Sequence, residues 1–118
     1  MATIKSYTDL EQSKALAEFL PLESADMWWN IELDDDNEID GYTPSFYPEP
    51  LSDSDILCWS LTALLSALDF PSLTQNKEDE WEVCVPNHTY DGYIEVSANN
   101  PVDACVEMVI KLHELNLL

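Results

Sequence analysis

Two short runs, Trp81-Glu-Val-Cys-Val85 and Tyr93-Ile-Glu-Val96, decide the fold of this chain, and Asp91-Gly92 lies between them. In both runs apolar and polar side chains alternate, and β-branched and aromatic residues are frequent, as in strands with one buried face. Asp-Gly between two such runs predicts a tight type I′ turn, because glycine adopts a positive φ without steric cost. Pro86 places the strand that it ends at a sheet edge or a bulge, since proline has no N–H for a ladder bond.

A helix is predicted directly after this hairpin. Asn100 is a favourable N-cap, and Pro101 suits the first helical position, where an N–H would have no partner inside the helix. Apolar residues then recur at helical spacing. The residues expected to face the core are Val102, Cys105, Val106, Val109 and Leu112.

Two more helices are expected upstream. The capping box Thr8-Asp-Leu-Glu11 opens the first, and Pro21 ends it. Ser52 or Asp53 opens the second, which runs to Pro71. A wide apolar stripe makes this second helix the expected centre of the core. The stripe consists of Leu57, Leu61, Leu64, Leu65 and Leu68.

The remaining segments complete the expected fold. Residues 27–33 alternate and predict a half-buried strand, whereas 34–52, acidic and then proline-rich, and 72–80 are predicted loops. The order αβαββα predicts an α+β fold: a three-stranded, mainly antiparallel sheet with helices packed on one face, in a single domain over 1–118. The expected core is Leu16, Leu20, Trp29, Ile31, Leu57, Leu61, Leu64, Leu65, Val83, Ile94, Val102, Val106 and Val109.

Charge is the extreme feature of the composition. The chain has 24 Asp and Glu residues against four Lys and no Arg, which gives a formal net charge of −20. No basic residue occurs between Lys14 and Lys77. Such a chain repels nucleic acid and anionic membranes, because binding to either requires cations. It attracts basic partners instead.

The cysteines and the hydropathy pattern favour a cytoplasmic protein. Cys58, Cys84 and Cys105 are an odd number without CxxC spacing, which indicates core thiols rather than a disulfide framework or a metal cage. No apolar run approaches the roughly 20 residues that cross a bilayer, and the first residues lack the apolar core of a signal peptide.

Several stretches carry a resemblance: Cys58-Trp-Ser-Leu-Thr-Ala-Leu-Leu-Ser-Ala-Leu68, Phe70-Pro-Ser-Leu-Thr-Gln-Asn76, Asn100-Pro-Val-Asp-Ala-Cys105 and the segment 13–27. With them the chain resembles a family of small uncharacterised proteins from gut bacteroidete genomes and their phages or mobile elements. The resemblance covers most of the chain except the acidic loop. It implies a setting in the bacterial cytosol or a phage-infected cell, and it implies no activity and no functional residues.

The acidic loop contains part of a calcium-binding pattern. Asp36-Asn-Glu38-Ile-Asp40-Gly41 places carboxylates at the first three ligand positions and glycine at the turn. The second half of the pattern fails, because Tyr47 stands where a bidentate Glu is required. A solvated acidic loop is the favoured interpretation. The alternative, a cation-binding domain, depends on Asp34, Asp36, Glu38 and Asp40.

Catalytic patterns are weaker still. Cys84 and His88, four residues apart on a strand, would be separated by more than about 10 Å, whereas a nucleophile and its base need hydrogen-bond contact. The sequence has no GxSxG, HExxH or phosphate-binding glycine loop. We therefore expect a non-enzymatic protein without a cofactor, and a small enzyme of unknown class is the remaining alternative.

The favoured function is an interaction module that binds a basic protein, in one form by imitating DNA and occupying a nucleic-acid-binding protein. Its expected surface is the outer face of the sheet, where aromatic anchors lie among carboxylates. With Asp91-Gly92 as a two-residue turn, Tyr90 pairs with Tyr93, and His88 lies across from Glu95. The expected partner-binding residues are Trp28, Glu32, Glu82, His88, Tyr90, Tyr93 and Glu95. Alternatively, the long loop or the first helix covers this face, and Trp28 belongs to the core.

Overall fold

The computed structural model of the chain describes residues 5–46, 48–87 and 92–118. It confirms the α+β class, with two three-stranded antiparallel sheets in place of the single expected sheet. The helices are α1 (Leu10–Ala17), the short 3-10 helix η1 (Leu22–Ser24), α2 (Leu61–Ala67) and α3 (Pro101–Glu114). In the first sheet, of order β2-β1-β3, the strands are β1 (Met27–Leu33), β2 (Ile39–Ser45) and β3 (Ile56–Cys58). In the second, of order β4-β5-β6, they are β4 (Ser72–Gln75), β5 (Trp81–Pro86) and β6 (Tyr93–Ala98).

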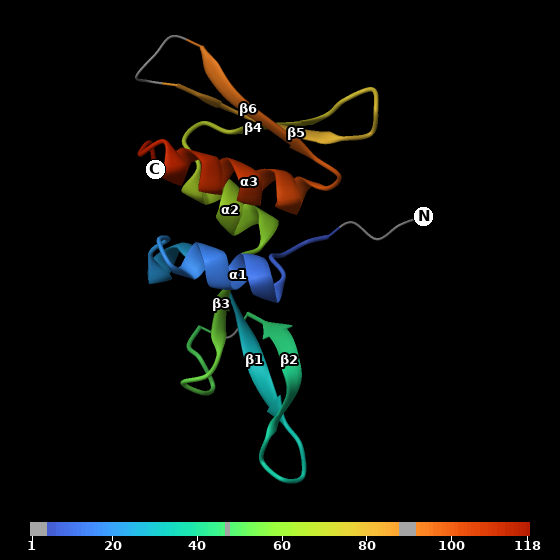
Figure 1. The fold of residues 1–118 in the computed structure, drawn as a ribbon, viewed down its shortest axis with the longest axis vertical. Coiled ribbons are helices and arrows are strands. Elements are labelled where there is room, and N and C mark those ends of the chain that lie inside the picture. The colour runs from blue at the N-terminus through green and yellow to red at the C-terminus, as the bar shows by residue number, and fades with distance from the viewer. Residues whose placement is uncertain (1–4, 47, 88–91) are drawn as a thin grey trace.

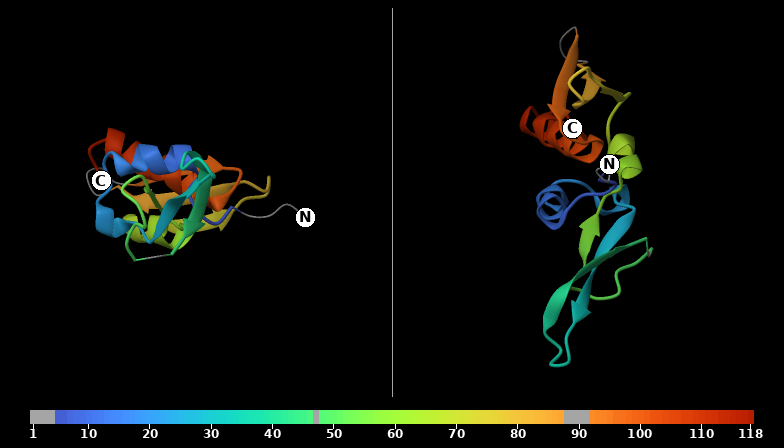
Figure 2. Two further views of the ribbon diagram at one scale, coloured as in Figure 1. Left: turned by 90° about the horizontal axis from the view of Figure 1, so that it is seen from below. Right: turned by 90° about the vertical axis from the view of Figure 1, so that its right-hand side faces the viewer.

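The elements are stacked along the long axis of the molecule (Figure 1). The β4-β5-β6 sheet lies at one end, α3 and α2 lie beneath it, α1 follows, and the β2-β1-β3 sheet forms the other end. Figure 2 shows from the side that the β1–β2 hairpin extends away from the helices. The radius of gyration is 15.8 Å, whereas about 13.5 Å is expected for a compact domain of this length. The hairpin accounts for the elongated shape.

The core lies between the helices and the β4-β5-β6 sheet. Its buried side chains include eight of the expected ones: Leu16, Leu20, Leu64, Val83, Ile94, Val102, Val106 and Val109. Leu57, Leu61 and Leu65 are only partly buried against it. Trp29 and Ile31 are half-buried in the other sheet. Trp59, absent from the expected core, is fully buried.

Helix α3 begins as its sequence predicts. The side chain of Asn100 accepts a hydrogen bond from the backbone N–H of Asp103 at 2.8 Å, and Pro101 occupies the first helical position. All five residues expected to face the core are buried. The helix start at Asn100 and Pro101 and the apolar spacing of α3 both depend on residues close in sequence. The packing of other elements therefore did not alter either of them.

Helix α1 begins one residue later than predicted. Its capping box joins Asp9 and Gln12, each side chain accepting the backbone N–H of the other, rather than Thr8 and Glu11. Thr8 is buried and bonded across the fold: its N–H donates to the carbonyl of Trp59 at 2.9 Å, and its hydroxyl accepts the N–H of Trp59 at 3.1 Å. The local pattern assigned Thr8 to the N-cap, but Thr8 is instead engaged in these tertiary hydrogen bonds with Trp59.

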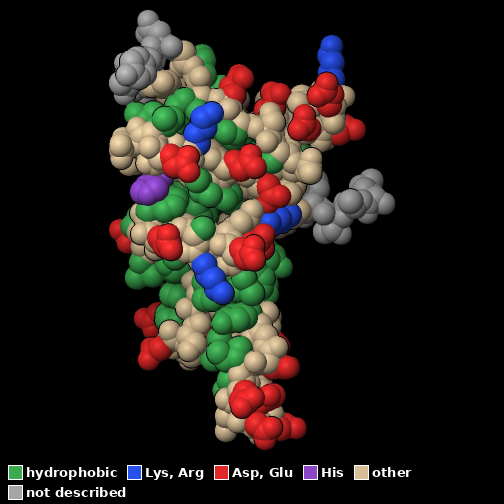
Figure 3. Space-filling model, in the orientation of Figure 1, with side chains coloured by type: hydrophobic (Ala, Val, Ile, Leu, Met, Phe, Trp, Pro, Cys, Tyr) green, Lys and Arg blue, Asp and Glu red, His purple; other side chains and the backbone are tan. Residues whose placement is uncertain are grey.

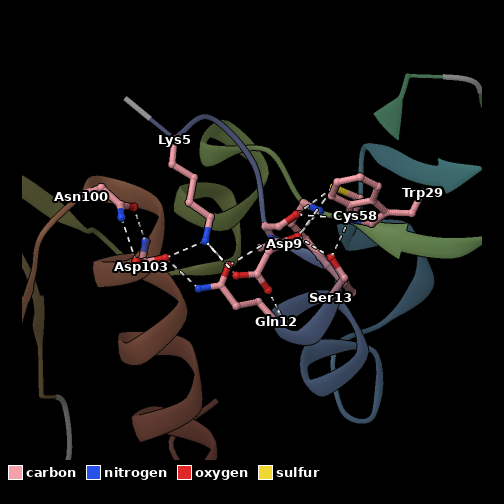
Figure 4. A network of polar contacts seen from close by, with 10 residues as sticks. Lys5, Asp9, Gln12, Ser13, Trp29, Cys58, Asn100 and Asp103 are labelled. Atoms are coloured by element: carbon pink, nitrogen blue, oxygen red, sulfur yellow. Dashed lines mark hydrogen bonds and ion pairs between the residues drawn. The ribbon is translucent and has the colours of Figure 1, made fainter. Parts of the chain in front are cut away.

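Lys5 joins the first turns of α1 and α3 (Figure 4). Its Nζ lies 3.1 Å from Asp9 Oδ2, 2.7 Å from Gln12 Oε1 and 2.8 Å from Asp103 Oδ1. Burial alone would lower the pKa of Lys5, but the hydrogen bonds and charges of the two carboxylates raise it above its ordinary value. This cluster ties the N-terminal segment to the last helix.

The predicted second helix is wrong in its first half. Residues 56–58 form strand β3, which pairs with Met27–Trp29 of β1, and α2 begins only at Leu61. Ser60 caps this helix by accepting from Ala63 N, while its own N–H and hydroxyl donate to Asp26. Asp26 lies far upstream in the sequence, so the local apolar stripe could not reveal this boundary.

Two of the predicted loops contain strands. Within 34–52, β2 pairs with β1 as an antiparallel hairpin, and within 72–80, β4 pairs with β5. Gly41 and Pro44 gave β2 the composition of a loop. Ile31 N–H donates away from β2, to Asp55 Oδ1, so by alternation Trp29 and Pro44 form a pair that exchanges no ladder hydrogen bonds, and the Pro44 nitrogen points away from β1. Pro44 therefore costs the ladder no hydrogen bond.

The hairpin between β5 and β6 is confirmed, but its predicted register and edge position are wrong. Pro86 pairs with Tyr93 and Cys84 with Glu95, so the connection is longer than Asp91-Gly92. β5 is the central strand of its sheet rather than an edge. Its proline is tolerated because β4 begins at Ser72, opposite Cys84, and so stops short of Pro86.

Candidate functional site

The acidic run between β1 and β2 forms a hairpin turn. Asp34 Oδ1 accepts the backbone N–H groups of Asp36 and Glu38, both at 2.9 Å, and Asn37 has a φ of 60°. Positive φ is tolerated by Asn more readily than by most residues. The exposed carboxylates of Asp34, Asp35, Asp36, Glu38 and Asp40 surround this turn.

The turn between β4 and β5 has the same construction. Asn76 Oδ1 accepts the N–H groups of Glu78 and Glu80, at 2.9 and 3.0 Å, and Asp79 has a φ of 61°. A neutral amide therefore performs in one turn what the carboxylate of Asp34 performs in the other. One oxygen of the Asp34 carboxylate is therefore engaged in holding the hairpin turn. Among the residues that the structure describes, no group of three or more His, Cys, Asp or Glu side chains converges as metal ligands would.

The two faces of the β2-β1-β3 sheet differ in character. One face carries Trp29, Ile31 and Leu33 of β1, opposite Pro44, Tyr42 and Ile39 of β2. Helix α1 covers its inner end: Trp29 Nε1 donates to Thr8 O and Ser13 Oγ, both at 3.2 Å. Towards the turn the cover ends, since Leu33 and Ile39 are about half exposed.

The opposite face of the same sheet carries Trp28, Asn30 and Glu32, as their alternation predicts. Asn30 is buried, accepts from Ser45 Oγ, and donates through Nδ2 to Asp55 Oδ2 at 2.8 Å. Glu32 is exposed and accepts from the Thr43 hydroxyl. Trp28 is half-buried, so neither the fully open nor the fully covered alternative describes it.

Trp28 lies in a hollow of about 370 Å³. Trp28 and Leu57 are cross-strand neighbours of β1 and β3 on the same face. The other lining residues come from η1 and the residue after it (Leu22, Glu23, Ala25) and from the β2–β3 connection (Pro48, Glu49, Pro50). The lining is thus mainly apolar, with two carboxylates.

Asp55 fixes the β2–β3 connection beside this hollow. Its carboxylate accepts from Ile31 N at 2.9 Å, from Leu51 N at 2.7 Å and from Ser52 N at 3.1 Å, besides Asn30. Burial alone would raise the pKa of Asp55, but these hydrogen bonds lower it below its ordinary value of 3.8. The charged form of Asp55 therefore holds the connection against β1.

The expected single partner-binding face is divided between the two sheets. Glu82, Tyr93 and Glu95 belong to β5 and β6, at the other end of the molecule from Trp28 and Glu32. His88 and Tyr90 lie outside the described residues. Tyr93 is exposed, and Glu95 pairs with Cys84 rather than with His88. The expected set is therefore not brought together.

The three thiols show no sign of activation. Burial raises the pKa of Cys105 to about 12. Burial, partly opposed by hydrogen bonds from Thr8 and Ser13, raises the pKa of Cys58. Burial and the neighbouring Glu95 carboxylate raise the pKa of Cys84. Nucleophilic cysteines have lowered pKa values, because the thiolate is the reactive form.

In comparisons with known proteins, no family model, no curated protein and no solved structure matches the chain. The resemblance to small gut bacteroidete proteins therefore stays a prediction. Over the described ranges, no helix combines the length and apolar character needed to cross a membrane.

Sequence reasoning singled out Trp28, which lines the hollow, for partner binding, but none of the other lining residues. Glu23, Glu49 and Leu57 come from three separate segments, and the pairing of β3 with β1 places Leu57 beside Trp28. The one available signal was Pro48-Glu-Pro50, in which two prolines stiffen a loop around a carboxylate.

Proposed function

We propose that this chain is a non-enzymatic interaction module that binds a basic protein through the β1–β2 hairpin. The observation that carries the proposal is the free end of this hairpin, where five exposed acidic residues lie next to the half-exposed Leu33 and Ile39 along the chain. Figure 3 shows the acidic side chains crowded at this end of the molecule. Apolar contact area beside a field of one sign suits a partner that is basic and amphipathic.

Electrostatics supports a role in association. The chain carries a formal net charge of −20, and no basic residue occurs between Lys14 and Lys77, the stretch that contains the whole β2-β1-β3 sheet. Such a field accelerates encounter with a cationic partner and weakens as salt is added. A cytoplasmic location, where basic nucleic-acid-binding proteins are available, is part of the proposal.

The test compares two matched variants. Asp35→Asn, Asp36→Asn and Glu38→Gln together remove three charges from the hairpin turn and keep Asp34, which holds the backbone. The control, Glu78→Gln, Asp79→Asn and Glu80→Gln, removes three charges from the similar β4–β5 turn. A partner is captured by pull-down from a bacterial lysate, purified, and titrated by calorimetry. We expect a loss of affinity of about tenfold or more for the hairpin variant and less than about threefold for the control. Equal losses would contradict a site at the hairpin.

A DNA mimic is the more specific form of this function. Acidic turns lie towards opposite ends of the long axis (Figures 1 and 3). The net charge amounts to one per about 2.8 Å (56 Å divided by 20 charges), against about 1.7 Å along duplex DNA. Duplex DNA should then compete with the chain for the partner. If DNA and the chain bind the partner together, mimicry is excluded while the hairpin site stands.

A further inference from the structure

The hollow at Trp28 combines three features. An indole and Leu57 lie side by side across β1 and β3, prolines 48 and 50 and Leu22 add apolar walls, and Glu23 and Glu49 bring two carboxylates. Its volume of about 370 Å³ lies at the lower end of the range of ligand pockets, about 300–1,000 Å³. It is therefore large enough for one long side chain.

The walls of the hollow are held in place by hydrogen bonds. Trp59 Nε1 donates to Ser24 Oγ at 3.0 Å and fixes the end of η1, and Asp26 accepts from Ser60 just after it. On the other side, Asp55 accepts from Leu51 N, directly after Pro50. A site shaped before binding loses little conformational entropy when a ligand enters.

The lining chemistry selects a cation with an apolar stem. Two carboxylates attract a positive charge, and an indole face stabilises a cation by about 0.5–2 kcal/mol. Arginine fits better than lysine, because its planar guanidinium stacks on aromatic rings, is less strongly hydrated than an ammonium, and binds carboxylates through two N–H groups.

We propose that one arginine side chain of the basic partner enters the Trp28 hollow, with its guanidinium against the indole and between Glu23 and Glu49. This inference rests on the proposed function, and it adds an anchor to the charge field of the hairpin. Arginine is among the residues that most often carry the binding energy of an interface, and such residues lie in well-packed pockets.

The test uses three synthetic nonapeptides that share lysine-rich flanks and differ at the central residue, which is arginine, lysine or citrulline. Binding is measured by calorimetry, and the indole N–H signal of Trp28 is followed by NMR. We expect the arginine peptide to bind about fivefold more tightly than the lysine peptide and to move the Trp28 signal, and citrulline to bind most weakly.

Two variants of the hollow and one control locate the effect. Glu23→Gln with Glu49→Gln should remove the preference for arginine, whereas Glu11→Gln with Glu107→Gln, an equal change of charge on exposed helix positions, should keep it. Trp28→Leu preserves an apolar strand residue and should also abolish the preference.

The outcomes separate this inference from the proposed function. Equal affinity for the arginine and lysine peptides, with an unmoved Trp28 signal, would contradict the proposed arginine anchor. The affinity of the hairpin variant for the partner would still test the proposed function independently. If free arginine moves the Trp28 signal as strongly as the peptide does at equal concentration, the hollow is a small-molecule site and the proposed anchor is wrong. If the hairpin variant has no effect but the arginine preference persists, the anchor stands and the hairpin does not.

Discussion

Lys5 Nζ lies 2.8 Å from Asp103 Oδ1, an ion pair that joins the beginning of the described chain to its last helix. Gln12 and Asn100 donate to the same aspartate, at 2.7 Å each, so the first turns of α1 and α3 share one polar cluster. Burial alone would raise the pKa of Asp103, but Lys5 and these amides lower it. The cluster fixes how α1 sits against α3.

Replacing Lys5 tests this link. Lys5→Met should lower the free energy of unfolding by about 1 kcal/mol, a value kept small because both partners are partly exposed to water. The pKa of Lys5 is raised above 10.5, so the contribution is complete at neutral pH and is lost as pH rises through the raised value. Urea denaturation measures the change, and Lys14→Met, on the exposed side of α1, is the control. Equal effects of the two variants would show that the ion pair of Lys5 and Asp103 contributes nothing to the free energy of unfolding.

Asp55 predicts a dependence on acid. Its folded pKa lies below 3.8, so the stability that its carboxylate adds is present above that pH and lost as pH falls through the folded value. Asp55→Asn should therefore cost about 1 kcal/mol at pH 7 and progressively less in acid. Thermal unfolding of both proteins from pH 7 to pH 3 measures this difference. Asp53→Asn should change little, and a difference for Asp55→Asn that grows in acid would contradict the assignment.

The core predicts a contrast between two leucines of α2. Leu64 is fully buried, and Leu61, expected from sequence to be equally central, is only partly buried. Leu64→Ala should cost about 2–5 kcal/mol, because the cavity cannot collapse fully. Leu61→Ala should cost less than about 2 kcal/mol, since less apolar surface is lost. Chemical denaturation gives both values, and a reversed order would mean that α2 presents its other face.

The net charge predicts a response to cations. NaCl should raise the melting temperature between low and moderate concentration, because counterions screen the repulsion among the carboxylates. Calcium and magnesium at equal concentration should raise it equally, since among the described residues no three acidic, His or Cys side chains converge as metal ligands would. A larger effect of calcium, removed by Asp36→Ala with Asp40→Ala, would instead establish a calcium site.

Signals that act within one turn of chain were readable from sequence. Asn100 and Pro101 start α3 as expected, and the alternation of residues 27–33 and 93–96 gives strands β1 and β6. These features depend on hydrogen bonds and packing preferences of neighbouring residues. The acidic excess, on which the proposed partner depends, is likewise a property of composition alone.

Only the tertiary structure decided where the remaining segments belong. Ile56–Cys58 is a strand because Met27–Trp29 offers it an edge. Pro44 is accepted in β2 because its pair with Trp29 exchanges no ladder hydrogen bonds, so its nitrogen points away from β1. Both outcomes depend on hydrogen bonds between segments distant in sequence, about which a local pattern carries no information. The same holds for the Trp28 hollow: composition determined that the chain is acidic, and the tertiary structure decided that Glu23 and Glu49 line the same hollow as the indole of Trp28.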